Sequence, residues 1–522
     1  MSDESAGCGS AGDLSRGPQH SSRGDVRKPR VTVPMVSLSR YDPSERSPVN
    51  LPVRLSARPP IRILLGTVMA ACLAMTLAVT LPTQSAASTT MELSNGGWLI
   101  DQTPPVLVQV QVNLSLSSNW SVVRLVDVPI VDYRVRSTTE GVTIAPADDG
   151  WGMQVAAGGG SAEIDAIIEL PTSDVTLRAE NGWLGEATAT VRSGTADPVT
   201  VTVPTYAWPA VATTNVPQDT FAAGIVQPPR ADPRPLALAH YYPWFTEYGN
   251  PDMAEKPADP RPATDPAGVL SMTEQARAHG VDGFLVSWRD NLNDGAAYDL
   301  ALQAAEQTNG YVAPTLEMVE LSNRSDTTAE LAAQVHDSLS EAYERTSSPA
   351  VLRSEGAMVV FAFETKLLPA AAWRDVLATL TAEGRPVRLV GDWGGDWSDN
   401  QWGVHSYIRN DSPETLAAHW RKTAMAQRAD DLLDGTSHLV TATVTPGYND
   451  TKLGRPNSKV VPRNAGLRYE ATWRATSGAD PDWILITSWN EWFENTNIEP
   501  GTTTGGQALQ QTAQLTADWK AR

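Results

Sequence analysis

Residues 265–286 read DPAGVLSMTEQARAHGVDGFLV and contain one helix followed by one apolar strand. Asp265 can cap the helix, Pro266 suits its first turn and Gly280 ends it. The apolar run at 281–286 follows directly, with the length and composition of a buried strand. This helix–strand unit indicates a fold in which helices and strands alternate.

The same alternation continues to the end of the chain. A second helix is predicted at 327–345, where Leu331, Val335 and Leu339 recur at helical spacing. Eight apolar runs occupy residues 236–239, 281–286, 312–316, 357–363, 387–390, 403–407, 438–444 and 483–487. A doubly wound open sheet is the alternative, but no Gly-rich phosphate fingerprint follows any run. The number and order of the repeats predict a (β/α)8 TIM barrel over residues 236–522.

Residues 91–203 have the period-two pattern of strands. Val108, Val110 and Val112 alternate with glutamines, and no helical period of useful length appears. We therefore predict an all-β sandwich, which could bind sugars or act as a spacer. Residues 204–235 contain seven prolines and are predicted to form a stiff linker.

The N-terminal segment at 61–87 is predicted to be a signal peptide or a transmembrane anchor. Its core, residues 63–81, reads ILLGTVMAACLAMTLAVTL without a charge and follows Arg54, Arg58 and Arg62. This charge bias places the large C-terminal body outside, either secreted or as a single-pass membrane-anchored protein. A lipoprotein with its lipobox at Cys72 is a weaker alternative.

The basic tail at 1–60 is rich in Ser, Arg and Pro and is predicted to be disordered. A true start downstream of Met1, for instance at Met35, is the other explanation.

Charge and cysteine content exclude several classes of function. Residues 1–62 hold 10 Lys/Arg against 6 Asp/Glu, which leaves 30 against 54 in residues 63–522. Such an acidic body repels phosphate backbones, so nucleic-acid binding is disfavoured. Both cysteines, Cys8 and Cys72, precede residue 91, so the predicted sandwich and barrel have no disulfide framework and no thiolate metal site.

Carboxylates and aromatic residues dominate the positions just after the predicted strands, where a TIM barrel places its active site. Carboxylates suit acid/base chemistry on sugars, and flat aromatic rings suit the faces of sugar rings. The pattern predicts a glycoside hydrolase. The predicted substrate-binding residues are Tyr241, Tyr242, Trp244, Trp288, Glu317, Asp392, Trp393, His405, Tyr407, Tyr448, Asn490 and Trp492. Further strand-end candidates are His240, Arg289, Glu364, Asp396 and Asp450.

The densest cluster, WNEWFE at 489–494, directly follows the last strand. Glu491 and Glu494 can share one face of a helical turn, close enough for the separation of about 5–5.5 Å used by retaining glycosidases. One could carry a raised pKa as proton donor while the other stays ionised. A solvated turn is the alternative, but the strand-end position and the aromatic neighbours favour a catalytic pair. No cofactor is predicted. No metal is predicted either, because Asp392, Asp396 and Asp399 lack the ligand spacing of a calcium-binding loop.

Three motifs add to this interpretation. Residues 490–499 read NEWFENTNIE; HYYPWF at 240–245 precedes YGNP at 248–251; PGYNDT at 446–451 precedes RP at 455–456. Together they resemble motifs of glycoside hydrolase family 99, the endo-α-mannosidases and endo-α-mannanases, over about residues 236–500. Glu317 and Trp288 also fall where this family places substrate-contacting residues.

The resemblance implies a polysaccharide or glycan substrate and retaining, endo-acting cleavage of α-mannosidic bonds. The family's proposed route uses the substrate's own 2-hydroxyl as nucleophile, through an anhydro-sugar intermediate. Carried over, Glu491 would deprotonate that hydroxyl and Glu494 would act as general acid, then base. Phe493 and Asn495 depart from the His and Gly that the family usually has there. A non-catalytic carbohydrate-binding cell-surface protein, an endo-α-glucanase-like protein and a polysaccharide-biosynthesis-associated relative remain alternatives.

Overall fold

The computed structural model describes residues 91–93, 98–117, 119–155, 158–182, 185–207, 210–245, 253–289, 292–392 and 400–522. The predictions for the tail at 1–60 and for the membrane or signal segment at 61–87 lie outside these ranges, as do Trp393, Asp396 and Asp399. Within these ranges no helix has both the length and the apolar character needed to cross a membrane.

Eight parallel strands form a closed barrel, which confirms the predicted fold. Each strand pairs with the next, and the first, β14, also pairs with the last, β24. Each predicted run matches one strand to within two residues at either end. The strands are β14 (Leu236–Tyr241), β15 (Gly283–Trp288), β16 (Tyr311–Glu317), β18 (Ala357–Phe363), β19 (Val387–Asp392), β20 (Gly403–His405), β21 (Leu439–Val444) and β24 (Trp483–Ile486).

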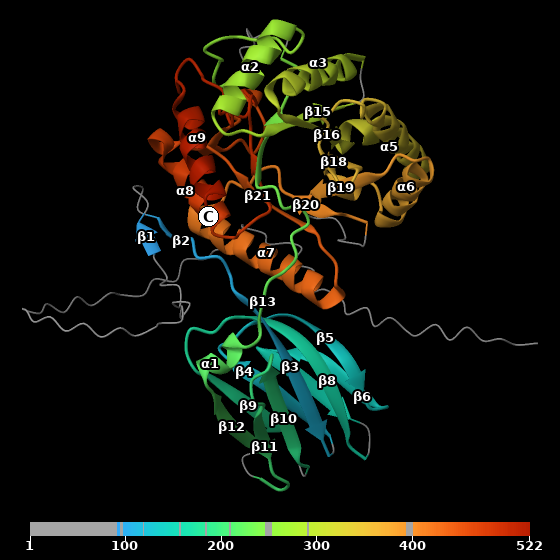
Figure 1. Ribbon diagram of the computed structural model, residues 1–522, viewed down its shortest axis with the longest axis vertical. Helices are drawn as coiled ribbons and strands as arrows, with labels where there is room; N and C mark the ends of the chain where they lie inside the picture. Colours follow the sequence, from blue (N-terminus) through green and yellow to red (C-terminus); the bar gives the residue numbers. More distant parts are fainter. Residues whose placement is uncertain are drawn as a thin grey trace, which may run out of the picture. The chain divides into compact units, whose positions relative to one another are not determined.

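Helices surround this ring of strands (Figure 1). They are α2 (Pro266–Ala278), α3 (Leu292–Thr308), α4 (Met318–Ser322), α5 (Thr328–Tyr343), α6 (Ala370–Ala382), α7 (Pro413–Asp434), α8 (Leu467–Ser477) and α9 (Gln507–Lys520). Asp265 caps α2 by accepting from the Ala267 N–H, as the sequence predicts. Thr327 and Glu330 form a capping box at the start of α5. Both helices therefore begin where polar side chains satisfy their first N–H groups.

The pleat of the barrel strands separates two apolar layers. On β14, Leu236 and Leu238 belong to the cluster inside the ring, together with residues such as Phe361. Ala239 and Tyr241 belong instead to the layer between strands and helices. Because successive side chains point to opposite faces, even-numbered positions of β14 face the barrel axis.

The N-terminal part of the described chain is a β-sandwich, again as predicted. One antiparallel sheet has the order β11-β10-β3-β8-β5 and the other β12-β9-β4-β7-β6. Val112, Val123, Trp151, Ile164 and Leu177 pack in its core. The strands are β3 (Leu107–Leu116), β4 (Trp120–Val126), β5 (Ile130–Thr138), β6 (Val142–Ala147), β7 (Gly150–Val155), β8 (Gly160–Glu169), β9 (Val175–Asn181), β10 (Ala187–Ser193), β11 (Val199–Val203) and β12 (Val211–Val216).

Both predicted boundaries of the sandwich need correction. The stretch interpreted as a linker contains β12, the short helix α1 (Gln218–Ala222) and β13 (Ile225–Val226), and β12 pairs with β9. A strand can form at 211–216 because the prolines of the stretch 204–235 all lie outside these six residues. At the other end, β1 (Met91–Leu93) and β2 (Leu99–Asp101) form a separate hairpin. Ile100 of β2 is buried in a cluster with Trp420 of α7 and Ala471 of α8.

Candidate active site

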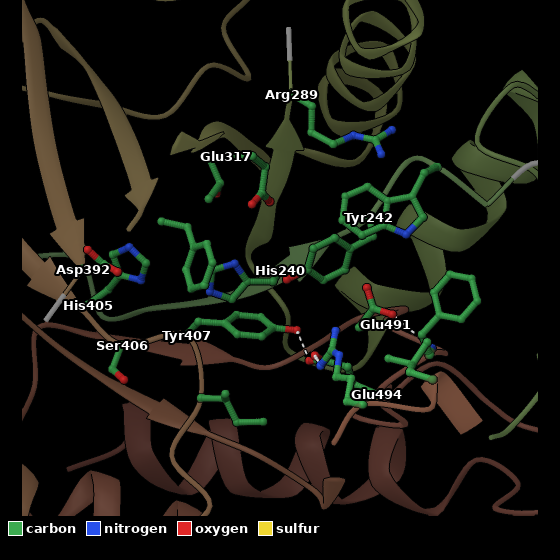
Figure 2. Close-up of a pocket in the computed structure, with 17 residues that line it drawn as sticks. His240, Tyr242, Arg289, Glu317, Asp392, His405, Ser406, Tyr407, Glu491 and Glu494 are labelled. Carbon is green, nitrogen blue, oxygen red and sulfur yellow. Dashed lines mark hydrogen bonds and ion pairs between the residues drawn. The ribbon is translucent and has the colours of Figure 1, made fainter. Parts of the chain in front are cut away.

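A cavity of about 740 Å³ opens at the C-terminal ends of the barrel strands (Figure 2). Its volume lies within the range of pockets that hold small ligands. Eight predicted site residues line it: Tyr242, Trp244, Glu317, Asp392, His405, Tyr407, Glu491 and Glu494. Figure 2 shows Glu491 and Glu494 on one side of the cavity and Asp392 with His405 on the other.

Strand parity explains which side chains reach the cavity. Each of three barrel strands contributes a pair of lining residues two positions apart, at its end or just past it: His240 with Tyr242, Thr315 with Glu317, and His405 with Tyr407. Side chains two apart share one face of a strand, so each pair extends from the barrel interior toward the opening. The upper member of each pair forms the wall, and the lower member lies deeper.

Glu491 is held in a buried position by the turn after β24. Its N–H donates to Ser488 Oγ at 2.8 Å, and its Oε1 accepts from the Phe493 N–H at 3.0 Å. The residue is 5% exposed. Burial, with a smaller contribution from the charge of Glu494, raises the pKa of Glu491 to about 8. At neutral pH this carboxyl therefore carries a proton.

Glu494 has different surroundings. Its Oε1 lies 2.7 Å from Nη1 of Arg455 and accepts from the Tyr448 hydroxyl at 3.3 Å. Its Oε2 accepts from the Tyr407 hydroxyl at 3.4 Å, the contact dashed in Figure 2. One guanidinium and two hydroxyl groups therefore lie within hydrogen-bond distance of this carboxyl group. The two carboxyls of the pair are thus placed in unequal environments within one cavity.

Aromatic rings form a wall next to the pair. The rings of Tyr242 and Trp244 have centroids 4.5 Å apart, and the guanidinium of Arg289 lies 4.6 Å from the centroid of Trp244. Phe493 also lines the cavity and packs against Phe245 at 5.4 Å. Burial raises the pKa of Tyr242 well above its usual value, so this hydroxyl stays neutral.

Asp392 is oriented by backbone groups. Its carboxylate accepts from the N–H groups of Glu364 and Thr365, both at 2.7 Å, and its own N–H donates to Thr365 Oγ1 at 2.8 Å. Glu364 itself pairs with Lys366 at 2.8 Å and does not line the cavity. Asp392 therefore presents a fixed carboxylate opposite the pair.

Three predicted substrate-binding residues are instead part of the core. Tyr241 packs against Phe284, and Trp288 packs edge-on against Tyr298, each with ring centroids 5.3 Å apart. They occupy the alternate parity of β14 and β15, so their side chains point away from the barrel axis. Trp492 is fully buried in the cluster beneath the aromatic wall.

Two other predicted residues act on the site without lining it. Asn490 accepts from the Tyr242 N–H at 2.8 Å and donates to the Tyr242 carbonyl at 2.9 Å. The Tyr448 hydroxyl lies 3.3 Å from Glu494 Oε1 and 3.1 Å from Asp450 Oδ2, and its one hydrogen can be donated to either carboxyl group. Asn490 and Tyr448 are therefore corrected to positioning residues.

Nine further residues line the cavity. Two of them, His240 and Arg289, are strand-end candidates named from the sequence, and the others are Thr315, Phe363, Ser406, Ile408, Leu453, Arg455 and Phe493. Thr315 lies two positions before Glu317 and so faces the same side of β16, a signal that is visible in the sequence. Arg455 belongs to the third motif and could have been predicted from it. Ile408 comes from a loop and Leu453 from the short 3-10 helix η2 (Thr451–Leu453), where no sequence pattern indicates the direction of a side chain. In the described part of the chain, no group of three His, Cys, Asp or Glu side chains is arranged to hold a metal ion.

No family model matches the sequence, and no curated protein matches it either. Among solved structures, a family 99 endo-alpha-mannosidase from Bacteroides thetaiotaomicron is 18% identical, with a TM-score of 0.47, covering 55% of this chain and 97% of its own. A GH5_18 protein from Streptomyces cattleya in complex with GlcNAc is 15% identical (TM-score 0.35; 56% and 82% covered). An alpha-amylase from Lactobacillus plantarum is 10% identical (TM-score 0.32; 55% and 79% covered). These similarities concern the fold alone.

Proposed function

We propose that this protein is a retaining glycoside hydrolase that cleaves internal bonds of an α-linked glycan, with α-mannan as the leading substrate. The observation that carries this proposal is the pair Glu491 and Glu494, placed in one cavity with unequal surroundings. Pairs of carboxyls whose environments push their proton affinities apart can supply both an acid and a base. The aromatic wall beside them suits the face of a sugar ring.

The charge states of the ligand-free protein suggest how the two acids divide the work. Glu491 holds a proton at neutral pH, so it is equipped to protonate the leaving oxygen. Glu494, paired with Arg455, is equipped to act as the carboxylate. The family resemblance implies the reverse assignment. Both assignments require both residues. They differ in which variant, Glu491→Gln or Glu494→Gln, should recover activity on a substrate whose leaving group needs no proton.

Product analysis on a panel of α-mannans and α-glucans tests the activity. Glu491→Gln and Glu494→Gln should each lower kcat by about 10²- to 10⁴-fold. Glu320→Gln is a matched control, because Glu320 is exposed on α4 outside the cavity. Retention is read from the anomer that first appears in the NMR spectrum. Binding without any product in the wild type would instead support a carbohydrate-binding protein without turnover.

An activated substrate separates the two role assignments. An aryl α-glycoside with an acidic phenol leaves without protonation, so the variant that lacks the general acid should recover most of its rate on it. If Glu491 is the acid, Glu491→Gln is rescued and Glu494→Gln is not. Rescue of Glu494→Gln alone would show that the assignment from charge states is wrong and that the family assignment applies.

We also propose that the body is exported, because the uncharged segment 63–81 follows three arginines. Fractionation of producing cells, with N-terminal sequencing of the mature chain, tests export and cleavage together. A full-length chain in the cytoplasmic fraction would contradict it.

A further inference from the structure

Three buried polar atoms beneath the catalytic pair have no hydrogen-bond partner among the described residues: His240 Nε2, Thr315 Oγ1 and His405 Nδ1. All three side chains line the cavity and are 3%, 3% and 1% exposed. Buried polar atoms are nearly always paired, so three unpaired atoms at one site need an explanation. We refer to His240, Thr315 and His405 as the polar floor.

The polar floor lies deeper in the barrel than the cavity wall. Its residues come from β14, β16 and β20, and each lies two positions before a wall residue: Tyr242, Glu317 or Tyr407. Side chains two positions apart share one face, so each floor residue lies below its wall residue. The two imidazole rings have centroids 6.1 Å apart. A ligand that enters past the catalytic pair therefore meets the polar floor.

The hydrogen-bonding role of His405 follows from its other nitrogen. Nε2 lies 3.1 Å from the carbonyl oxygen of Ala362, which can only accept, so Nε2 carries the hydrogen. Burial lowers the pKa of His405, and the ring is neutral. In a neutral imidazole the second nitrogen is an acceptor. His405 Nδ1 therefore requires a donor from the ligand.

The charged groups around the floor exclude an anionic ligand. Glu317 and Asp392 line the cavity beside it, and the charge of Asp392 acts on His405. Arg455 is paired with Glu494, and Arg289 stacks on Trp244. An acceptor next to carboxylates repels a carboxylate or phosphate and suits a neutral hydroxyl group.

We propose that the polar floor is a hydroxyl-recognition subsite for one neutral sugar ring. His405 Nδ1 accepts a hydrogen bond from a sugar hydroxyl, and His240 Nε2 and Thr315 Oγ1 pair with its other hydroxyls. This inference rests on the proposed glycan function and adds a substrate class: sugars with free hydroxyls on the edge that enters first. O-substituted sugars and uronic acids are rejected, because they leave the floor unpaired or bring a negative charge.

Binding is measured by calorimetry in the Glu491→Gln background, which blocks turnover. The probes are oligosaccharides of yeast α-mannan and of α-1,3-glucan in three forms: native, partly O-methylated, and oxidised at C6 to the uronic acid. The native form of at least one glycan should bind, with its methylated and oxidised forms at least tenfold weaker. Because these arms use an unaltered floor, they do not depend on the folding of a floor variant.

Floor variants then locate the effect. Thr315→Val and His405→Phe should each weaken binding of the native glycan about three- to tenfold, the loss expected for one neutral hydrogen bond. Thr441→Val is the matched control, because the Thr441 hydroxyl donates to the Val404 carbonyl and does not line the cavity. Thr315→Val should matter less for the methylated glycan, since the two changes remove the same contact.

The proposal is overturned if folded floor variants bind the native glycan within twofold of the parent, or if the oxidised glycan binds as tightly as the native one. Binding that depends on the floor, without product from the wild type, would support the subsite and contradict hydrolysis. Product formation by the wild type, together with floor variants that bind the glycan as the parent does, would support hydrolysis and contradict the subsite. The two failures are therefore distinguishable.

Discussion

Arg455 Nη1 lies 2.7 Å from Glu494 Oε1, and the same nitrogen lies 3.2 Å from the Tyr448 hydroxyl. Arg455 belongs to the loop after η2 (Thr451–Leu453), whereas Glu494 follows the last barrel strand. A cation from one loop thus fixes a carboxylate from another, and Tyr448 connects the two. The position of Glu494 therefore depends on a loop as well as on the barrel.

We expect Arg455→Met to lower kcat/KM by about 10- to 100-fold, because hydrogen bonds to charged groups are worth about 1.5–3 kcal/mol. Lys452→Met, an exposed change in the same loop, should leave kcat/KM unchanged. Steady-state kinetics on the cleaved glycan provide the measurement. An Arg455→Met enzyme with wild-type kinetics would show that this contact does not position Glu494.

The pH dependence of stability follows from two buried acids. Burial raises the pKa of Glu491 and of Glu499 to about 8, above their value in the unfolded chain. Between about pH 4.5 and 8 the folded protein therefore holds protons that the unfolded chain has released. The free energy of unfolding should fall as pH rises through this window, by about 1.4 kcal/mol per pH unit for each group.

Below pH 6.5 the buried histidines act in the opposite direction. Burial lowers the pKa of His240 to about 3 and that of His419 to about 4, so protonation favours the unfolded chain there. Between about pH 4.5 and 6.5 the two acids and the two histidines therefore offset each other, so calorimetry should find a nearly constant melting temperature there and a fall above pH 6.5. Glu499→Gln should flatten the fall above that pH, while the exposed control Glu186→Gln should not. An unchanged slope in Glu499→Gln would contradict a neutral Glu499.

The side-chain directions at β14 and β15 predict that substitutions of two aromatic residues change different quantities, stability in one case and KM in the other. Trp288→Phe should lower the free energy of unfolding by about 1–3 kcal/mol and leave KM unchanged, because Trp288 lies in the core. Tyr242→Leu should raise KM about 3- to 10-fold through loss of the aromatic face. Urea unfolding and kinetics on the same preparations separate these effects. A raised KM in folded Trp288→Phe would restore it as a substrate-binding residue.

Asn490 should act through Tyr242. Asn490→Ala leaves the Tyr242 N–H and carbonyl unpaired, which costs about 2–5 kcal/mol for two buried groups. Asn490→Asp keeps the acceptor and loses the donor, so its stability should be intermediate. The same order should appear in kcat/KM, because the Tyr242 ring lines the cavity. Equal stability for both variants would show that the two hydrogen bonds are not independent contributors.

The sequence predicts the barrel well because its strands are buried on both faces, which produces uninterrupted apolar runs. The same property hides the direction of each side chain. Tyr241 and Tyr242 are adjacent in one run, and only closure of the ring shows that Tyr242 faces the cavity while Tyr241 faces a helix. In the sandwich, one face of a strand such as β3 is exposed to water, so the alternation of apolar and polar residues can be recognised in the sequence.

The departure at Asn495 has a physical explanation that the sequence alone does not provide. Asn495 has φ = 51°, in the left-handed region, where the resembled family has glycine. Asparagine tolerates this conformation better than other side chains, so the turn that carries Glu494 is kept. Leu453 of η2 and Arg455 of the following loop lie outside any strand register, so their place at the site depends on how these segments pack.

The hairpin that precedes the sandwich has a consequence for dissecting the chain. Ile100 is buried among Leu416, Trp420 and Ala471, and Trp98 packs against the same cluster. A fragment that starts at residue 236 would contain every catalytic candidate yet expose this apolar surface to water. A barrel fragment should therefore begin before residue 98 to keep this surface covered, and the sandwich lies in the sequence between two segments that pack against each other.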